Sequence, residues 1–526
     1  MRGARIVLTA LLVGCSAAQG GAIAPGVPGD SARRAVPSSP HERLLKGVIK
    51  VKDFVVGPSD HVDIVGSGVK IFATDKIDIQ GSVELEPDAT FKFFAPTVTL
   101  SPRSFTAANT NQTGVDAISA CALSIDETAV ITTASGHDLY LTAGPKGNKS
   151  CEMFLFGQLK AGDGLKATNA AEPGEDGGSI EIGTHNAIAN ANATANFSGV
   201  EWSAARPYSV VVGNPQGYGS LAAGLGGEGG AVKETLLPGL AQYRAGKGGD
   251  GGSIVIDADR YDGDGPFILA GNGGDGGSIF QNASTSLDGV PGAPNGTSVS
   301  VTQGSGGIGG SIVITAPVIK GNKYARAGSG GNPSYIFGIH VGAGLFANSN
   351  IPGATSSGKG GSAEYEIGDY GVAGSGTTDA SYRVEDGLYG QVQFDGATGG
   401  SATGFGGPVP GSDGGSFTLK AGRHTLADLQ KHNLTIVLTT GFGMGGTSWG
   451  NCPSSNTPGL NGANGGLLHD GGMMALFTLN PNPFGQQVDF GAGTGANGTP
   501  PGSPGMQGHN DEGQLLGSPG STGNVC

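Results

Sequence analysis

Between Val62 and Leu100, apolar residues come in pairs two positions apart, and the residue between the two members is usually polar. Two residues at this spacing lie on the same face of a β-strand, so each pair predicts one short strand with one apolar face. Every third pair recurs after 21 or 22 residues. The pairs are Val62/Ile64, Val69/Ile71, Ile77/Ile79, Val83/Leu85, Phe91/Phe93 and Val98/Leu100. Three strands per coil of about 22 residues predict a right-handed parallel β-helix, because antiparallel hairpins would not require so regular a coil length.

Glycine makes up 102 of the 526 residues, against about 7% in ordinary proteins. Disorder is not expected, since the glycines alternate with β-prone runs such as those at 254–256 and 312–314. We expect glycine to form the corners of the coils, where positive φ lets the chain bend sharply. The predicted fold class is all-β: a right-handed parallel β-helix, or β-solenoid, with glycine-rich corners and a Gly/Pro-rich C-terminal segment.

A Gly-Gly-Ser motif recurs along the middle of the chain. Successive serines of the motif are 74, 25, 33, 51 and 54 residues apart, close to one, two or three times about 25. We expect each motif to mark the same corner of successive coils. The serines are Ser179, Ser253, Ser278, Ser311, Ser362 and Ser416. The aspartates near these glycines do not keep the nine-residue spacing of calcium-binding glycine repeats, so we predict no cofactor and keep calcium as the weaker alternative.

The charge and the N-terminal residues predict the compartment. A net charge of −14 disfavours nucleic acid and anionic membrane as partners, because both would repel the chain. Residues 1–20 have a basic start, a short apolar stretch and small residues, which predicts a secretory signal peptide too short to span a membrane. Cys15 leaves bacterial lipid attachment open as an alternative. Eight Asn-x-Ser/Thr acceptors favour a secreted eukaryotic glycoprotein: Asn111, Asn148, Asn192, Asn196, Asn282, Asn295, Asn433 and Asn497.

The rest of the chain divides into three further parts. Residues 21–47 contain four prolines and no strand periodicity, which indicates a linker or propeptide. Residues 48–440 are predicted to form the β-helix with glycine-rich insertions. Residues 441–526 are predicted to be a Gly/Pro-rich cap or tail of polyproline type, because their Pro-Gly steps lack the strict three-residue period of collagen.

Four cysteines lie beyond the predicted signal peptide, an even number that suits disulfides in a secreted protein. Cys121 and Cys151 are 30 residues apart, one coil plus a short insertion, so we expect them to pair across stacked strands. Cys452 and Cys526 would then form a second bridge. No metal site is predicted, because neither Cys-x-x-Cys nor a Cys-and-His cluster occurs and the nine histidines do not adopt metal-binding spacing.

Four carboxylates crowd one predicted strand and corner: Asp257, Asp259, Asp262 and Asp264. Asp257 and Asp259 share a face, and paired carboxylates near an arginine are suited to calcium binding or to acid–base cleavage of polysaccharide. The sequence favours a solvated, glycine-flanked turn, and the catalytic interpretation stays as the alternative.

Four of the eleven tyrosines fall within 25 residues: Tyr365, Tyr370, Tyr382 and Tyr389. Aromatic rings stacked on an outer face could bind sugar rings. The alternation around Tyr365 favours ordinary strand packing instead, so both interpretations are kept.

Over residues 48–141 the chain resembles secreted parallel β-helices, the class that includes pectin-lyase-like enzymes and filamentous-haemagglutinin-type adhesins. This resemblance rests on periodicity, so it implies a fold more than an activity. Pectin-degrading hydrolases of this class carry Asn-Thr-Asp, Asp-Asp, Gly-His-Gly and Arg-Ile-Lys strings, and the chain has none of them.

The sequence therefore predicts a secreted, non-catalytic structural or adhesive protein of the cell wall or extracellular matrix. Its expected partner is a cell-wall or host polysaccharide. The alternative is a carbohydrate-active β-helix, either a polysaccharide lyase or a glycoside hydrolase, that uses the aspartate group at 257–264.

Overall fold

In the computed structural model the chain divides into two compact units, Met1–Ser39 and Pro40–Cys526. All elements given below belong to the second unit, and the predicted signal peptide lies outside the described residues. The structure describes residues 42–108, 113–144, 150–183, 195–197, 200–202, 205–213, 218–232, 242–280, 300–302, 304–316, 318–331, 336–337, 363–367, 391–395, 413–420, 425–431, 435–439, 459–479, 490, 492–497 and 500–525.

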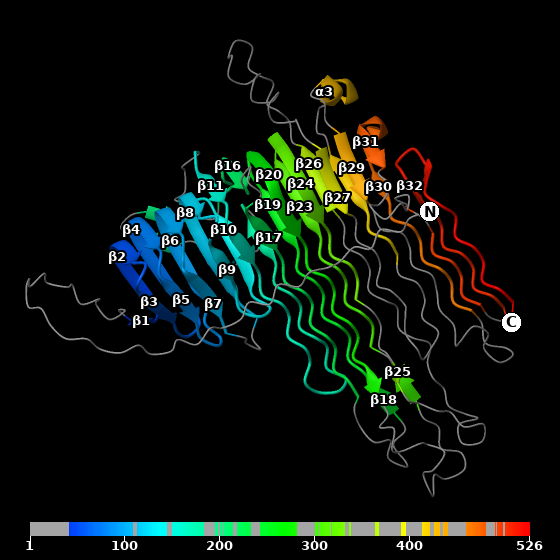
Figure 1. Cartoon of the computed structure of the whole chain (residues 1–526), viewed down its shortest axis with the longest axis horizontal. Coiled ribbons are helices and arrows are strands. Elements are labelled where there is room, and N and C mark those ends of the chain that lie inside the picture. Colours follow the sequence, from blue (N-terminus) through cyan, green and yellow to red (C-terminus); the bar gives the residue numbers. More distant parts are fainter. Residues whose placement is uncertain are drawn as a thin grey trace, which may run out of the picture. The chain divides into compact units, whose positions relative to one another are not determined.

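Nearly all regular structure is β, and nearly all strand pairs are parallel (Figure 1). One sheet has the order β1 (Glu42–Leu45), β3 (His61–Ile64), β5 (Ser82–Leu85) and β7 (Ser104–Ala107). The first strands of the large sheet pair in succession: β2 (Val48–Val56), β4 (Val69–Ile79), β6 (Phe91–Leu100) and β8 (Val115–Ile125). Strand pairing therefore begins at Glu42, within the predicted linker at 21–47.

The strand register confirms the predicted recurrence of the apolar pairs. The residues that lie opposite each other on adjacent strands are Val62 and Val83, Val69 and Phe91, and Ile77 and Val98. One detail differs from the prediction of three strands per coil. The second and third apolar pairs of a coil lie in one strand, with a register shift between Phe72 and Lys76, because strand pairing resumes directly after the bend.

Beyond β8, the later strands continue the pairing in separate columns. One column runs β8, β10, β13, β19, β23, β26, β28 and β30, and a second runs β8, β11, β16, β20, β24, β27, β29 and β31. A third joins β9, β12, β17 and β20. Their bounds are β9 (Val130–Thr132), β10 (Asp138–Thr142), β11 (Glu152–Leu155), β12 (Gln158–Lys160), β13 (Ile180–Ile182), β16 (Ser209–Val212), β17 (Ser220–Ala222), β19 (Ile254–Asp257), β20 (Arg260–Leu269), β23 (Ile312–Ala316), β24 (Val318–Arg326), β26 (Ala363–Ile367), β27 (Gln391–Asp395), β28 (Phe417–Lys420), β29 (Thr435–Thr439), β30 (Leu468–His469) and β31 (Phe477–Leu479).

The remaining elements are short. Two strand pairs are antiparallel, β14 (Ala195–Phe197) with β15 (Val200–Trp202) and β32 (Gly508–His509) with β33 (Leu515–Leu516). Two are parallel, β18 (Gln242–Arg244) with β22 (Ser300–Thr302) and β21 (Ile279–Phe280) with β25 (Ile336–Phe337). Among the described residues, the helical elements are α3 (Leu426–Lys431) and η2 (Met474–Leu476). Within the described ranges, no helix has the length and apolar character needed to cross a membrane.

The core lies on the inner face of the strands. In β3 and β5 the buried residues alternate with partly or fully exposed ones, as a strand with one apolar face requires. The buried side chains form one continuous cluster that includes members of both sheets. Phe72 and Phe94 stack across β4 and β6 with ring centroids 4.6 Å apart and an interplanar angle of 10°.

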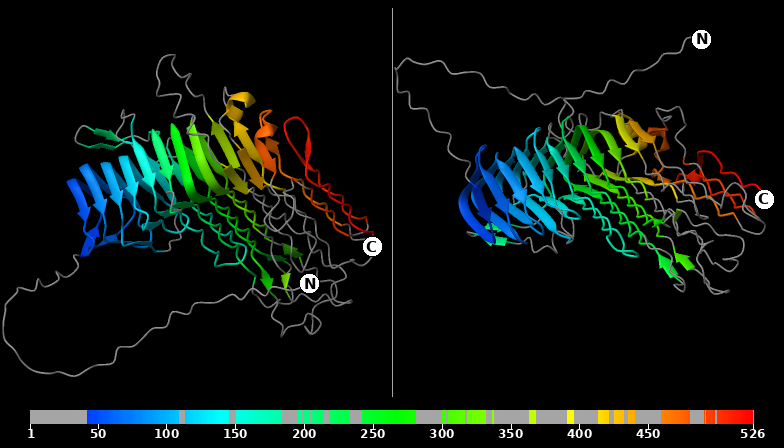
Figure 2. Two further views of the ribbon diagram at one scale, coloured as in Figure 1. Left: turned by 45° about the horizontal axis from the view of Figure 1, so that its top comes forward. Right: turned by 60° about the horizontal axis from the view of Figure 1, so that its bottom comes forward.

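The described glycines of the Gly-Gly-Ser motifs do not adopt the positive φ expected at corners, and this part of the expectation was wrong. Among the described glycines, positive φ occurs at turns such as Gly66 and Gly68, and not in these motifs. The motif glycines lie instead in extended segments whose backbones pack directly on each other (Figure 2). A Cβ atom on Gly252 would lie 2.0 Å from the carbonyl oxygen of Gly178. Glycine is required there by close approach of backbones, and not by a bend.

These segments bond to each other through every third residue. The N–H groups of Gly246, Gly249 and Gly252 donate to the carbonyl oxygens of Gly230, Gly227 and Gly224 at 2.8 to 2.9 Å. Three residues per turn is the repeat of the polyproline II helix. We call this set the glycine bundle; its described segments are 162–178, 223–232, 245–253, 270–278, 304–310 and 327–331.

The C-terminal region repeats this arrangement. Gly459, Gly462 and Gly465 donate to the carbonyl oxygens of Pro500, Ser503 and Met506, each at 2.9 Å. Extended segments of this region are thus hydrogen-bonded to one another, and their polyproline type stays a prediction. The hydrogen bonds between segments repeat every three residues. The order of Pro and Gly along the chain does not show this period.

Side chains complete the bonding of the glycine bundle. Asp250 accepts an N–H from Ile308 at 2.8 Å, while its own N–H donates to Asp176 at 2.7 Å. In the same way Ser253 accepts from Ser311, and its N–H donates to Ser179, both at 3.0 Å. Each of these side chains therefore supports the backbone of the next coil. The same role falls to Asp163, Asn272, Asp413, Asn461, Asn464 and Asn497.

Most of the described Gly-Gly-Ser motifs fall at the same position of successive coils, but one does not. Ile180 lies opposite Ile254, and Ile254 lies opposite Ile312, so the motifs of Ser179, Ser253 and Ser311 fall in register. The residue after Ser416 continues this column. The residue after Ser278 pairs with Ile336 in a separate two-stranded sheet. The Ser362 motif lies outside the described residues.

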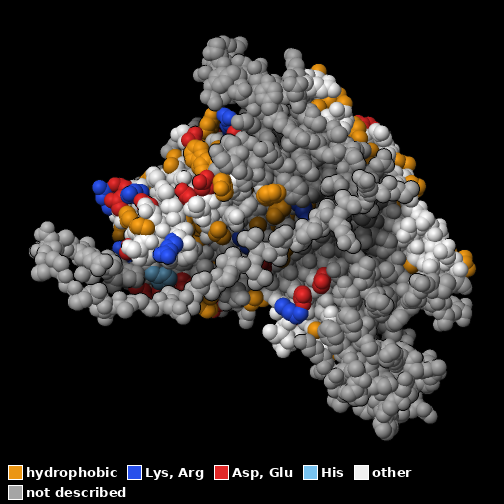
Figure 3. Space-filling view, viewed as in Figure 1, with side chains coloured by type: hydrophobic (Ala, Val, Ile, Leu, Met, Phe, Trp, Pro, Cys, Tyr) orange, Lys and Arg blue, Asp and Glu red, His pale blue; other side chains and the backbone are white. Residues whose placement is uncertain are grey.

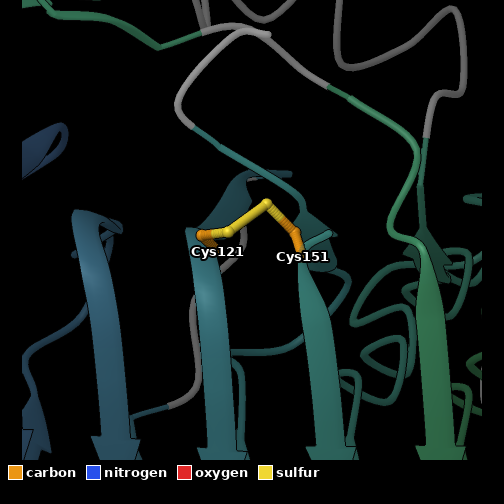
Figure 4. Close-up of a disulfide and its surroundings, with 2 residues drawn as sticks. All are labelled: Cys121 and Cys151. Carbon is orange, nitrogen blue, oxygen red and sulfur yellow. A yellow bond between two sulfur atoms is a disulfide. The ribbon is translucent and has the colours of Figure 1, made fainter. Parts of the chain in front are cut away.

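The Cys121–Cys151 disulfide is present as predicted (Figure 4). Ala122 lies opposite Glu152, which brings the two cysteines together at the start of paired strand segments with Cα atoms 4.2 Å apart. The bond fixes the register of β11 on β8. Cys452 and Cys526 lie outside the described residues.

Candidate functional site

The aspartate group at 257–264 meets a cation from another coil. The Arg206 Nε atom lies 3.2 Å from Asp257 Oδ1 and 3.2 Å from Asp259 Oδ1, and the guanidinium also donates to the Ala258 carbonyl. One arginine thus compensates both carboxylates at the bend between β19 and β20. The sequence could not identify this partner, since Arg206 precedes Asp257 by 51 residues.

The other two aspartates do not complete an acid pair around this cation. Asp262 lies within β20 and is partly buried. The side chain of Asp264 is outside the described part of the chain. The described geometry is that of an ion pair that links adjacent coils, because Arg206 occupies the space between the two carboxylates where a bound cation would otherwise be held.

The predicted tyrosine cluster cannot be assembled from the described residues. The backbone of Tyr365 lies in β26, opposite Ile314, but its side chain is not described. Tyr370, Tyr382 and Tyr389 lie outside the described residues.

A different aromatic group lies exposed where the coils turn between the second and third strand columns. Phe154 and Phe156 have ring centroids 5.9 Å apart, at an interplanar angle of 44°. Tyr218 is 52% exposed and Phe267 is 51% exposed. We call these four residues the aromatic corner. On the face drawn in Figure 3, hydrophobic side chains are scattered among charged and other side chains of the described residues.

Register places the aromatic corner on three successive coils. Gln158 pairs with Ser220, and Ser220 pairs with Phe267. Phe156 and Tyr218 each lie two residues before a paired position, so they occupy corresponding places one coil apart. Phe267 lies at the Ser220 position of the next coil, two residues further along than Phe156 and Tyr218 in their coils. Partly exposed rings gathered on neighbouring coils give a surface on which a sugar chain can stack. The spacing of these residues along the sequence is irregular, and only the register reveals the group.

A buried ionisable group lies beneath the first strand column. Asp116 is 0% exposed and His137 is 1% exposed, with Asp116 Oδ2 3.4 Å from His137 Nδ1. The Phe91 N–H donates to Asp116 Oδ1 at 2.8 Å. Burial raises the pKa of Asp116, and the hydrogen bonds from His137 and Phe91 oppose that rise.

Asp138 and Tyr140 extend this ionisable group along β10. Asp138 accepts an N–H from Ser179 at 2.7 Å and the Tyr140 hydroxyl at 3.1 Å. Burial raises the pKa of Asp138 and also that of Tyr140, while burial lowers the pKa of nearby Lys92. Both carboxylate oxygens of Asp138 are engaged with the protein itself. These contacts connect coils, which is a structural role.

The comparisons with known proteins agree in their outcome: no family model, curated protein or solved structure matches the chain.

Proposed function

We propose that the coils close into one right-handed parallel β-solenoid, and that the protein is a secreted, non-catalytic scaffold that adheres to polysaccharide of a cell wall or extracellular matrix. The closed solenoid is supported by the columns of parallel strands and by a core shared between the two sheets. Each coil bonds to the coils before and after it, which gives a body stiff along its length.

The observation that carries adhesion is the aromatic corner. The partly exposed rings lie on successive coils at positions that strand pairing fixes, so a sugar chain meets a preformed surface and little side-chain conformational freedom is lost on binding. The Asp257 and Asp259 carboxylates are already compensated by Arg206, which favours binding over cleavage.

The test is co-sedimentation of the purified protein with insoluble chitin, β-glucan and pectin. We expect binding to at least one of them, and an affinity about tenfold lower for the Tyr218→Ala/Phe267→Ala variant, since one to three kcal/mol is typical for loss of a stacked aromatic contact. Tyr208→Ala is the matched control, because Tyr208 is 47% exposed and lies outside the aromatic corner.

The same incubation separates adhesion from catalysis. The soluble fraction is assayed for reducing and unsaturated sugars, with and without calcium. We expect no release. Release that disappears in Asp257→Asn and Asp259→Asn variants would replace the scaffold by the carbohydrate-active alternative, a lyase or glycoside hydrolase.

A further inference from the structure

Three potential metal ligands meet on the outer face of the four-stranded sheet. In β3 the residues Val62 and Ile64 are buried, which turns His61 and Asp63 outward. In β5 the same alternation turns Glu84 outward. One ligand atom from each of His61, Asp63 and Glu84 lies within 4.8 Å of the others. The sequence does not indicate this group, because Glu84 joins it through strand register alone.

The distances between the ligand atoms lie just below and just above the distance expected between two ligands of one metal ion. His61 Nε2 lies 2.8 Å from Asp63 Oδ1 and 3.9 Å from Glu84 Oε2. Ligand atoms about 2.1 Å from a tetrahedral ion lie roughly 3.4 Å from each other. To bind an ion, the distance from His61 to Asp63 must lengthen and the distance from His61 to Glu84 must shorten, each by about half an ångström. Small side-chain rotations allow this, because the side chains of His61, Asp63 and Glu84 are 34%, 19% and 59% exposed.

The electrostatics of the strand register also favour a cation. Asp63 lies directly opposite Glu84 on the adjacent strand, and Glu42 lies opposite His61 on the other side. Like charges in directly opposed positions of a sheet destabilise it. His61 Nε2 contacts Asp63 Oδ1 at 2.8 Å, and a divalent cation between the two carboxylates removes their mutual repulsion.

We propose that His61, Asp63 and Glu84 bind one divalent transition-metal ion of the Zn²⁺ type. An imidazole nitrogen beside carboxylates selects such ions over Ca²⁺ and Mg²⁺, which prefer oxygen ligands throughout. The ion binds the lone pair of Nε2 in the neutral tautomer, whose single proton is on Nδ1, and a ring that is protonated on both nitrogens first releases its Nε2 proton to solvent. Three protein ligands leave a fourth position for water or for an oxygen atom of an external ligand.

The test is calorimetric titration of Zn²⁺ into the full-length protein, purified without a histidine tag and stripped with a chelator. We expect one strong site in the wild type and at least about tenfold weaker binding in His61→Ala and Glu84→Gln. His469→Ala is the matched control, since His469 Nδ1 lies 2.9 Å from Asp511 Oδ1 but no third ligand joins this pair among the described residues. Circular dichroism checks that each variant is folded.

Three results would overturn the proposal. The first is no Zn²⁺ binding by the wild type at micromolar concentrations, and the second is His61→Ala binding as strongly as the wild type. The third is Ca²⁺ binding that equals Zn²⁺ binding and does not depend on His61, which would leave only an acidic surface. None of these results bears on the polysaccharide experiment, because the aromatic corner contains none of these residues.

Discussion

At the residue scale, the glycines illustrate how one amino acid serves two purposes in this protein. Gly66 and Gly68 adopt positive φ at a turn, which other residues rarely do. Gly224 and Gly252 have ordinary φ but leave no space for a side chain. Substitution in the glycine bundle is therefore costly for steric reasons.

Gly252→Ala tests this steric argument. The added Cβ would lie 2.0 Å from the Gly178 carbonyl oxygen, so the backbones must separate. We expect a loss of 1 to 3 kcal/mol, on the order of other overpacked sites, measured as a lower midpoint of thermal unfolding. Gly57→Ala is the control, since its Cβ would meet Asp60 at an ordinary 3.4 Å. Equal effects of the two substitutions would contradict the argument.

Asp138 provides a pH-dependent prediction. Its pKa is raised by burial, so the folded state holds the proton more tightly than the unfolded chain. The contribution of Asp138 to stability is therefore full below the ordinary value of about 4 and is lost as the pH rises through the raised pKa. Asn stays neutral and keeps an oxygen for the Ser179 N–H. We expect Asp138→Asn to gain stability relative to the wild type as the pH rises from about 4 through the raised pKa of Asp138, measured by urea unfolding.

Asp511 is the contrasting case. The hydrogen bonds from His469 and from the Gly471 N–H lower its pKa, so its contribution is present above about pH 4 and lost as the pH falls through the lowered pKa. Asp511→Asn should therefore lose stability relative to the wild type at neutral pH and regain it in acid. A parallel response of both variants to pH would contradict the assignment.

At the scale of the element, the extended glycine segments depend on side chains as well as on glycine. A strand in a parallel sheet pairs its backbone with two neighbours, while a polyproline II segment has no internal hydrogen bonds. Asp250 and Ser253 supply acceptors for the next coil, and the chain of contacts from Asp176 through Asp250 to Ile308 spans three coils. Asp, Asn and Ser between paired glycines thus have a bonding role that turn chemistry does not describe.

Asp250 tests this role. Asp250→Ala removes the acceptor of the Ile308 N–H and should cost about 1 kcal/mol, with faster hydrogen exchange at the Ile308 amide. Asp250→Asn keeps an oxygen in the same place and should retain most of the protection, although it loses the ion pair with Lys247 at 2.9 Å. If both variants exchange at the same rate, the ion pair and not the acceptor protects this amide.

At the scale of the whole molecule, contacts between successive coils connect the parts of the chain. The disulfide, the Arg206 ion pair and the side-chain acceptors of the glycine bundle each join one coil to another. The proposed aromatic corner and metal site depend on the same feature, since each takes its residues from more than one coil. Hydrogen-bonded pairing of parallel strands places such residues at fixed separations.

The sequence by itself determined the parallel strands, their recurrence after 21 or 22 residues and the Cys121–Cys151 bridge. Each of these depends on the alternation of apolar and polar residues or on a separation of about one coil, and both can be read directly from the sequence. The tertiary structure alone decided the role of the motif glycines, the partner of Asp257 and Asp259, and the meeting of His61 with Glu84. Each of these depends on which backbone segments or side chains lie side by side in the folded chain. The spacing of residues along the sequence does not give this, because residues on neighbouring coils are separated by segments of unequal length.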